Sequence, residues 1–467
     1  MTIQSINPAT EEVLASFDEF TVEQIRRVLD AAVATFQGWR RTSFAERARL
    51  MRNAASYLRQ HKAELAGLIT AEMGKPIVEA EAEIEKCAWN CDFYAENVDQ
   101  FLAPQSVSTN ARESYVAFEP LGTVLAIMPW NFPFWQVFRF AAPALMAGNV
   151  ALLKHASNVP QCALAIEEVF KAAGFPHGAF QTLLISGAVA ETLIEDHRIQ
   201  AVTLTGSDST GTKVAQAAGR SLKKTVLELG GSDPFIVLAD ADLGAAAATG
   251  ARARNQNAGQ SCIAAKRFIV VQDVADEFEK LLVEKTAKLR VGDPMLRETD
   301  VGPLARSDLR EALEDQVRRS LEEGAYLAIG GHRLERRGYF YAPTVLTGVT
   351  PDMLAGREET FGPVAAVIRA RDTQEAIAIA NHSRFGLGAS LWTRDIEGAH
   401  ALARDIEAGS VFVNGMVASD PRLPFGGIKR SGYGRELSEF GIREFVNIQT
   451  VWIGPATGIT APSVPVE

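Results

Sequence analysis

The chain has 467 residues, which is more than a single hydrophobic core usually supports, so two or three domains are expected. Its apolar fraction of 47% and charged fraction of 22% are ordinary for a globular α/β protein. The net charge of −10 argues against nucleic acids and anionic membranes as partners, because both would repel an acidic protein.

Cysteine usage and the N-terminus indicate a cytoplasmic protein. The cysteines are too few in so long a chain for a disulfide framework, so reduced thiols are expected at Cys87, Cys91, Cys162 and Cys262. The acidic N-terminus lacks the basic-then-apolar pattern of an export signal. One long apolar stretch, residues 120–153, is interrupted by prolines and glycine, so short strands and loops are expected there instead of a membrane span.

Helices are expected to dominate the first hundred residues. Apolar residues recur at helical spacing through residues 21–70, and a further helix is expected at 79–98. Cys87 and Cys91 lie one turn apart in this second region, but no His or Cys cluster nearby completes a metal site. We therefore interpret them as two half-buried helix positions.

Strands and helices then alternate in two series. Dense β-formers at residues 106–123 predict a strand or hairpin, whose expected partner is the β-rich segment 444–452. The first series has apolar runs at 124–128, 150–153, 180–185 and 201–204, with helices at 161–173 and 188–196. The second has runs at 235–238, 268–271, 364–368 and 410–413, with helices from 241, up to 288 and at 307–323. This alternation predicts two mostly parallel sheets with right-handed crossovers and a boundary near Gly230.

Cys262 is the first candidate for chemistry. It lies between a flexible Gly-Gln-Ser approach and the apolar run at 268–271. At such a junction free backbone N–H groups can stabilise a thiolate, and thiolate character governs the reactivity of a cysteine. The alternative is a buried, unreactive cysteine, and this window alone does not decide between the two.

Glu228 is the second candidate, because Leu227-Glu228-Leu229 places a carboxyl group inside an apolar run. Burial raises the pKa of a carboxyl group, which suits a general base that works near neutral pH. The alternative is an ion pair with a neighbouring base, Lys223 or Lys224.

Two turns carry small or rigid residues. The turn from Thr205 to Gly211 follows an expected strand and opens a helix, where small residues let the backbone approach a phosphate or a nicotinamide ring. No Gly-x-Gly-x-x-Gly follows a strand, so the ordinary dinucleotide-binding fingerprint is absent. In Pro-Trp-Asn-Phe-Pro the rigid backbone can hold the Asn131 amide as a donor to an oxyanion, and the alternative is an amide that only caps the turn.

Together these windows resemble the aldehyde dehydrogenase superfamily, and the resemblance runs from Asn7 to Trp452. The matching motifs are Pro-Trp-Asn131-Phe-Pro, Thr-Gly206-Ser-x-x-x-Gly211, Glu228-Leu-Gly-Gly, Gly-Gln-x-Cys262, Glu-Glu359-Thr-Phe361-Gly-Pro and Pro424-Phe-Gly-Gly-Ile-Lys-x-Ser-Gly-x-Gly-Arg-Glu. The resemblance implies an α/β fold with two parallel-sheet, Rossmann-like domains and a small β oligomerisation hairpin. The implied layout is a cofactor-binding domain at 1–105 and 123–230, a catalytic domain at 231–437, oligomerisation strands at 106–122 and 438–455, and a frayed tail at 456–467.

The resemblance also implies a mechanism. The Cys262 thiolate attacks an aldehyde, the Asn131 amide and the Cys262 N–H bind the oxyanion, and Glu228 activates the water that hydrolyses the thioester. Coenzyme-A-acylating relatives generally lack a Glu at this position, so a free acid is the expected product.

A nicotinamide cofactor follows from the same resemblance. The implied cofactor-binding residues are Trp130, Lys154, Ser157, Gly206, Ser207, Gly211, Glu359 and Phe361. Lys154 would bond the adenosine ribose, and Glu359 would hold the nicotinamide ribose with Phe361 packed beside it. Relatives that use NAD often carry a Glu in place of Ser157, and that carboxylate would repel the 2′-phosphate of NADP. A small hydroxyl leaves room and a hydrogen bond, so we expect NADP to be preferred, with NAD as the alternative.

The substrate prediction depends on Arg139, the sole charged residue within 120–153. A guanidinium in that setting needs an anionic partner, which a substrate carboxylate can supply; the alternative is an ion pair with a fixed Asp or Glu. In the resemblance, Trp135 and Phe425 are apolar walls and Ser419 adds a hydroxyl at the substrate entrance. The sequence looks most like the succinate-semialdehyde dehydrogenases of the superfamily. We therefore expect oxidation of succinate semialdehyde to succinate by a homodimer or homotetramer, without a metal.

Other activities use part of the same set. Another aldehyde is one alternative, such as glutarate semialdehyde, an apolar aldehyde or an amino-aldehyde, although Arg139 is unexplained by an apolar substrate and would repel a cationic one. A cofactor-independent cysteine esterase or hydrolase would use Cys262 and Glu228 without binding a dinucleotide. A catalytically retired protein is disfavoured, because Asn131, Glu228 and Cys262 are all present.

Overall fold

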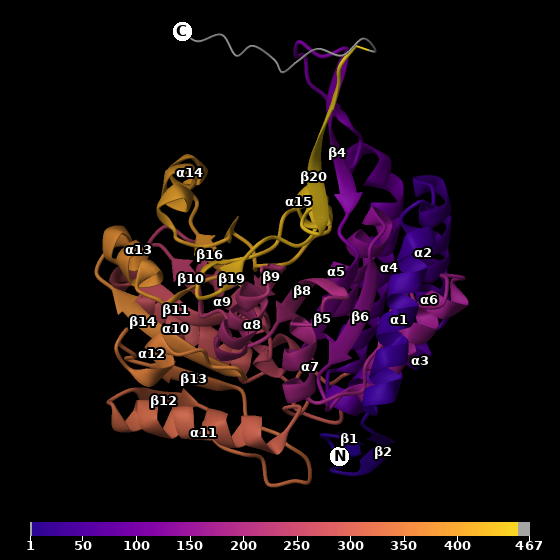
Figure 1. Ribbon diagram of the computed structural model, residues 1–467. Coiled ribbons are helices and arrows are strands. Elements are labelled where there is room, and N and C mark those ends of the chain that lie inside the picture. The colour runs from indigo at the N-terminus through magenta and orange to yellow at the C-terminus, as the bar shows by residue number, and fades with distance from the viewer. Residues whose placement is uncertain (1, 456–467) are drawn as a thin grey trace.

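Two mostly parallel sheets organise the molecule, each built from one half of the chain except for one short strand, β19 (Figure 1). The computed structural model describes residues 2–455. The first sheet has the strand order β19 (Gly432–Tyr433), β9 (Lys224–Glu228), β8 (Ile199–Thr205), β5 (Thr123–Met128), β6 (Val150–His155), β7 (Phe180–Thr182). The second has the order β12 (Tyr326–Ile329), β13 (Thr344–Thr347), β14 (Val364–Ala370), β11 (Ala265–Val271), β10 (Asp233–Val237), β16 (Gly388–Trp392), β17 (Ser410–Val413). The α/β class with two parallel-sheet units, predicted from the sequence, is confirmed.

Helices flank both sheets. In the first half they are α1 (Val22–Trp39), α2 (Phe44–Gln60), α3 (Lys62–Met73), α4 (Ile77–Phe101), α5 (Trp135–Ala147), α6 (Pro160–Ala172), α7 (Gly187–Ile194) and α8 (Asp208–Arg220). In the second half they are α9 (Leu243–Asn255), the 3₁₀ turn η1 (Gln256–Gly259), α10 (Gln272–Thr286), α11 (Ser307–Glu322), α12 (Leu354–Arg357), α13 (Thr373–Asn381), α14 (Ile396–Asp405) and α15 (Ser438–Arg443). The remaining strands are β1 (Thr2–Ile6), β2 (Val13–Asp18), β3 (Gln105–Ser106), β4 (Glu113–Pro120), β15 (Phe385–Gly386), β18 (Ile428–Lys429) and β20 (Val446–Ile453).

The second sheet shows how the sequence pattern becomes a two-sided core. Along β10, Phe235 and Val237 join one apolar cluster, whereas Ile236 between them joins another. Successive side chains of a strand point to opposite faces, so a strand covered by helices on both faces must be apolar throughout. This explains why the run at 235–238 shows no polar alternation.

The apolar stretch 120–153 differs from the expectation of strands and loops. Between β5 and β6 it forms α5, a fully buried helix of 13 residues that contains Pro143. Because α5 packs against α4, β6 and α15, it is buried on all sides and lacks the exposed polar face by which a surface helix is recognised. No helix within residues 2–455 is both long and apolar enough to cross a membrane.

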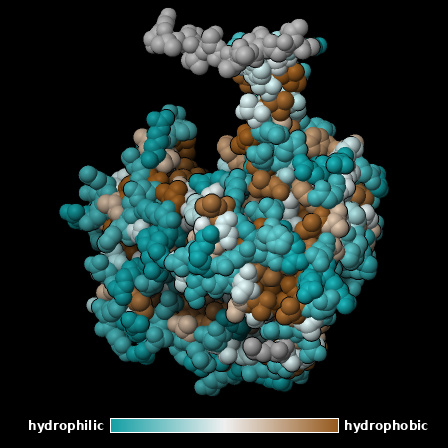
Figure 2. All heavy atoms as spheres, in the orientation of Figure 1, coloured by the Kyte–Doolittle hydropathy of each residue, from teal (hydrophilic) through white to brown (hydrophobic). Residues whose placement is uncertain are grey.

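A three-stranded antiparallel sheet projects from the body of the molecule (Figure 1). Strand β20 pairs with β4 from Val446 opposite Pro120 to Ile453 opposite Glu113, and β3 pairs with the other edge of β4. The pairing expected between residues 106–123 and 444–452 is therefore present. β20 is an edge strand, and apolar side chains lie on this projection, including Ile448, which is 64% exposed (Figure 2).

The order of strands in the first sheet places two loops next to each other. The chain runs from β5 outward through β6 and β7, then returns to the other side of β5 to form β8 and β9. Ligands of parallel sheets bind at the carboxyl ends of the strands where the order reverses. Asn131 follows β5 and Gly206 follows β8, so both lie at this crevice.

Candidate active site

Cys262 follows a tight loop whose backbone is left-handed over three successive residues. Asn257, Ala258 and Gly259 have φ angles of 54°, 52° and 72°. A Cβ atom at Gly259 would run into the backbone of Gly362, so this position requires glycine for space as well as for conformation. A non-glycine residue in this region costs about 1–3 kcal/mol, which neighbouring contacts must offset.

Hydrogen bonds from three directions hold this loop. Glu79 of α4 accepts from the Asn257 N–H at 2.8 Å, and the Asn257 Nδ2 donates to the Asn131 carbonyl oxygen at 2.7 Å. The buried Asn131 amide in turn donates to the Gln260 carbonyl oxygen at 2.9 Å. Its donor therefore lies beside the loop that precedes Cys262 instead of capping its own turn, and one amide hydrogen remains for a ligand.

Lys266 links Cys262 to Glu359. Its Nζ donates to the Cys262 carbonyl oxygen at 2.7 Å and lies 3.2 Å from the Glu359 carboxylate. That carboxylate also accepts from the Gly231 N–H at 3.1 Å. Glu359, predicted as a cofactor residue, is thus fixed close to the Cys262 loop.

The four cysteines differ in access. Cys87, Cys91 and Cys162 are fully buried, deeper than the half-buried positions expected for the first two, whereas Cys262 is partly exposed and lines a cavity. Burial nevertheless raises the pKa of the Cys262 thiol to about 12, against the opposing influence of Arg139. The thiol is therefore protonated at neutral pH and must lose its proton before it can react.

Glu228 ends strand β9 and is buried. Burial, followed by the nearby Glu436 carboxyl, raises its pKa well above the usual range. Within residues 2–455 neither carboxyl oxygen has a hydrogen-bond partner. The alternative of an ion pair with its basic neighbours does not apply, because Lys224 pairs with Glu444 and Lys223 donates to the Asp196 carbonyl oxygen.

Arg139 has a partner inside the protein. Its Nε forms a buried ion pair with Glu436, and its Nη2 donates to Thr205 at 3.3 Å. The guanidinium also lies 4.5 Å from the centroid of the Phe425 ring. The expectation that Arg139 lacks a fixed anion is corrected, because the ion pair considered as the alternative is present; contact with a substrate carboxylate stays a prediction.

A cavity of about 150 Å³ opens beside Cys262. Each residue predicted to bind substrate lines it, namely Trp135, Arg139, Ser419 and Phe425. Asn131 and Glu228 are buried and do not line it. The cavity also receives side chains from α4, which the sequence analysis did not consider, including Lys86 and Glu79. Burial raises the pKa of Glu79 to about 7.

Sequence reasoning missed these α4 residues and Glu436 for different reasons. Lys86 and Glu79 stand in an ordinary charged helix, where nothing local marks them. Glu436 is the last residue of the family motif that begins at Pro424, so the motif included it, but nothing in the sequence assigned it a function.

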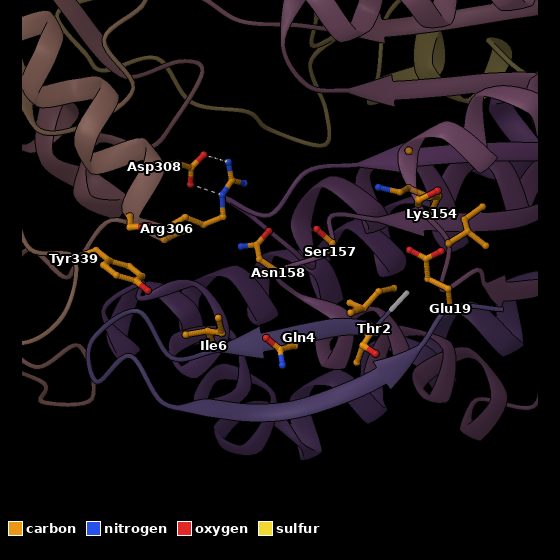
Figure 3. A pocket seen from close by; sticks show the side chains of 16 residues that line it. Thr2, Gln4, Ile6, Glu19, Lys154, Ser157, Asn158, Arg306, Asp308 and Tyr339 are labelled. Carbon is orange, nitrogen blue, oxygen red and sulfur yellow. Dashed lines mark hydrogen bonds and ion pairs between the residues drawn. The ribbon is translucent and has the colours of Figure 1, made fainter.

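A second cavity of about 500 Å³ lies at the carboxyl end of β6 (Figure 3). Lys154 and Ser157, both predicted to bind the adenosine end of the cofactor, line it together with Glu19 and Arg306. Burial lowers the pKa of Lys154, and Glu19 opposes this effect. Arg306 is held by Asp308 through two hydrogen bonds of 2.8 Å. An ammonium and a small hydroxyl at a sheet's carboxyl edge suit a phosphate group.

The other predicted cofactor residues lie outside this cavity. Trp130 meets Phe361 edge to face, with ring centroids 5.8 Å apart. Ser207 caps α8 by accepting from the Thr210 N–H at 3.3 Å, directly after Gly206. A Cβ atom at Gly211 would lie 2.6 Å from the Leu229 side chain, so this glycine allows α8 to pack closely on the segment after β9.

Comparison with known proteins identifies the family of this chain. The model of the aldehyde dehydrogenase family matches residues 1–451. A probable succinate-semialdehyde dehydrogenase (NADP+) of a Synechocystis species is 56% identical over 97% of this chain and all of its own length. A succinate-semialdehyde dehydrogenase (NADP+) of Mycobacterium tuberculosis is 52% identical with the same coverage. The crystal structure of succinic semialdehyde dehydrogenase from Streptococcus pyogenes with NADP+ has a TM-score of 0.95 and 39% identity, covering 97% of this chain and all of that one.

The raised pKa of Cys262 predicts an unusual alkylation profile. Only the thiolate reacts with iodoacetamide, so the rate of modification should rise about tenfold per pH unit from pH 7 to 10 without levelling off. The rate is followed by intact mass under native conditions. Cys262→Ala serves as the control and should take up no label, because the other three cysteines are fully buried. A plateau at or below pH 9 would contradict the expected pKa.

Proposed function

Since the chain belongs to the aldehyde dehydrogenase family, we propose that it oxidises succinate semialdehyde to succinate with NADP+. Relatives named for that reaction are 52–56% identical over nearly the whole chain. The observation that carries the proposal is the small cavity at Cys262, where Lys86 has no ion pair among residues 2–455, whereas the second cation, Arg139, is paired with Glu436. Such a cavity favours a short aldehyde that ends in a carboxylate over a neutral one.

The reaction begins at Cys262. Its thiolate sulfur bonds to the aldehyde carbon, and the carbonyl oxygen becomes an oxyanion that accepts from the Asn131 amide and the Cys262 N–H. Asn131 is already oriented by its bond to the Gln260 carbonyl oxygen, so little reorganisation accompanies this step. When bound, NADP+ supplies the acceptor for the hydride that leaves this carbon. The product of that stage is a thioester on Cys262.

Glu228 completes the cycle by hydrolysis. Its carboxylate takes a proton from a water molecule, the water oxygen bonds to the thioester carbon, and the Cys262 sulfur leaves. Burial next to Glu436 raises the pKa of Glu228, so the unprotonated base becomes more abundant as the pH rises. The sulfur leaves as a thiolate and takes up the proton held by Glu228, while the new carboxylic acid releases its proton, so the products are succinate, a proton and the free thiol.

The proposal also covers the oligomeric state of the protein and its cellular compartment. The exposed apolar side chains on the edge strand β20 support a homodimer or homotetramer in which the projecting sheet is covered by another subunit. The unpaired cysteines support a reducing, cytoplasmic setting.

Comparing two aldehydes tests the substrate. We expect kcat/KM with NADP+ to be at least tenfold higher for succinate semialdehyde than for butyraldehyde, because a charge-assisted contact contributes about 1.5–3 kcal/mol. Formation of reduced cofactor gives the rates. Equal rates for both aldehydes would exclude recognition of the carboxylate. If neither is oxidised with NADP+ or NAD+, the cysteine hydrolase becomes the better explanation.

Replacing Glu228 by Gln should separate the two halves of the reaction. The first turnover should still yield about one equivalent of NADPH per subunit, whereas steady turnover should fall by at least about 100-fold, because the general base is lost. Stopped-flow absorbance measures the burst, and intact mass detects the trapped thioester on Cys262. Normal steady turnover in this variant would contradict the role given to Glu228.

Replacing Ser157 by Glu should change the cofactor preference. The new carboxylate would repel the 2′-phosphate, so the ratio of kcat/KM for NADP+ to that for NAD+ should fall by at least about tenfold. Ser157→Ala is the matched control, since it removes the hydroxyl without adding charge, and it should change the ratio less. An unchanged ratio in Ser157→Glu would show that Ser157 does not lie at the 2′-position.

A further inference from the structure

One wall of the cavity at Cys262 presents hydrogen-bond donors that lack an acceptor. The Ser419 Oγ accepts from the Lys86 Nζ at 2.8 Å and from the Trp135 Nε1 at 3.1 Å. A hydroxyl oxygen has two lone pairs, so both are used and only its proton remains to be shared. The hydrogen bonds of residues 2–455 include no acceptor for that proton.

The Lys86 ammonium forms no ion pair with a carboxylate among residues 2–455. The ion pairs of residues 2–455 include none at Lys86, whereas the other cation of the cavity, Arg139, is paired with Glu436. The two carboxylates that raise the pKa of Lys86, Glu83 and Asp420, already have other partners. Glu83 pairs with Lys75 and accepts from two backbone N–H groups, and Asp420 is held by Arg422.

The surroundings fix the position of this ammonium group. Its Nζ lies 4.4 Å from the centroid of the Trp135 ring, a distance at which a cation is attracted to the ring face. Together with the bond to Ser419, this contact holds Lys86 over the cavity. Burial lowers the Lys86 pKa to about 8, so a bound anion would stabilise the charged form.

We propose that Lys86, oriented by Ser419 and Trp135, binds the carboxylate of the aldehyde substrate, and that the Ser419 hydroxyl donates a second hydrogen bond to the same group. This assignment rests on the proposed function and names the residues that determine its specificity. A cavity of about 150 Å³ is comparable in size to one that encloses benzene, so it admits only a short chain between the carboxylate and the carbon next to Cys262. Arg139, held by Glu436, contributes to the potential of the cavity.

The test compares Lys86→Met with the wild-type enzyme on two aldehydes. The methionine keeps the apolar stem of the side chain and removes only the charge and its hydrogen bonds. We expect kcat/KM for succinate semialdehyde to fall at least about tenfold, mainly through KM, because the contact exists both before and during the reaction. The value for butyraldehyde should change less than about threefold. Lys280→Met, an exposed position on α10, is the control for net charge and should leave both values unchanged.

Two further variants keep the proposal testable if Lys86→Met is poorly folded. Lys86→Arg should retain most of the preference for the acid aldehyde, because the charge is kept. Ser419→Ala should weaken it by several-fold, because one donor and the anchor of Lys86 are lost. Preservation of the wild-type preference in Lys86→Met or Ser419→Ala would overturn the assignment and leave the proposed function standing. A wild-type enzyme without any preference would instead contradict the proposed function itself.

The pH dependence of the preference gives an independent readout. The ratio of kcat/KM for the two aldehydes cancels the titration of Cys262 and Glu228, which serve both substrates. In the wild-type enzyme this ratio should fall above about pH 8, as free Lys86 loses its proton, and Lys86→Met should not show that fall. The groups that face Lys86 are Glu83 and Cys87 of α4, Arg139 of α5, and Asp420. Glu79 also titrates in the cavity, but it does so in both proteins. Identical profiles for the two proteins would overturn the assignment.

Discussion

The site depends on a short stretch of left-handed backbone between α9 and β11 of the second half, which hydrogen-bonds to the loop after β5 of the first sheet. Asn257 and Ala258 adopt positive φ angles only because contacts from elsewhere hold them, chiefly the Asn257 amide on the Asn131 carbonyl and Glu79 on the Asn257 N–H. Asn131 follows β5 of the first sheet, whereas Cys262 precedes β11 of the second. Two hydrogen bonds, from Asn257 to the Asn131 carbonyl oxygen and from the Asn131 amide to the Gln260 carbonyl oxygen, therefore place Asn131 beside the Cys262 loop. The relative position of the sheets thus sets the geometry of the proposed reaction.

Burial then controls the charge of the reacting groups. The carboxyl of Glu228 is buried and the thiol of Cys262 is partly exposed where it lines a cavity, and burial raises both pKa values. Glu436 raises the pKa of Glu228 and Arg139 lowers it, and Arg139 also opposes the rise in the pKa of Cys262. A charged group in such an interior costs several kcal/mol unless it is paired, which explains why Arg139 is fixed while Lys86, nearer to solvent, stays available.

Much of this organisation is local in sequence and was predictable for that reason. Apolar runs that alternate with helical stretches indicate parallel sheets, because a crossover helix must follow each strand, and the observed strands β5, β6 and β8 match the expected runs. Glu228 in its apolar run is buried as expected. The helix α5 was not predictable in the same way, since a helix that is buried all round has no period to detect.

The sequence by itself determined the fold class and predicted the nucleophile, the base and the cofactor residues. Those predictions rest on several motifs matched together, because the windows around Cys262 and Glu228 each left an alternative open. Only the tertiary structure decided which of the two cations at the Cys262 cavity, Lys86 or Arg139, is without a paired carboxylate among residues 2–455. The sequence around Arg139 shows no anionic partner, because Glu436 lies in a distant segment. The sequence around Lys86 shows no special environment, because its hydrogen-bond partner Ser419 lies 333 residues further along the chain. Pairing between charges depends on distance in space, and a chain of this length brings such residues together only after both sheets have formed.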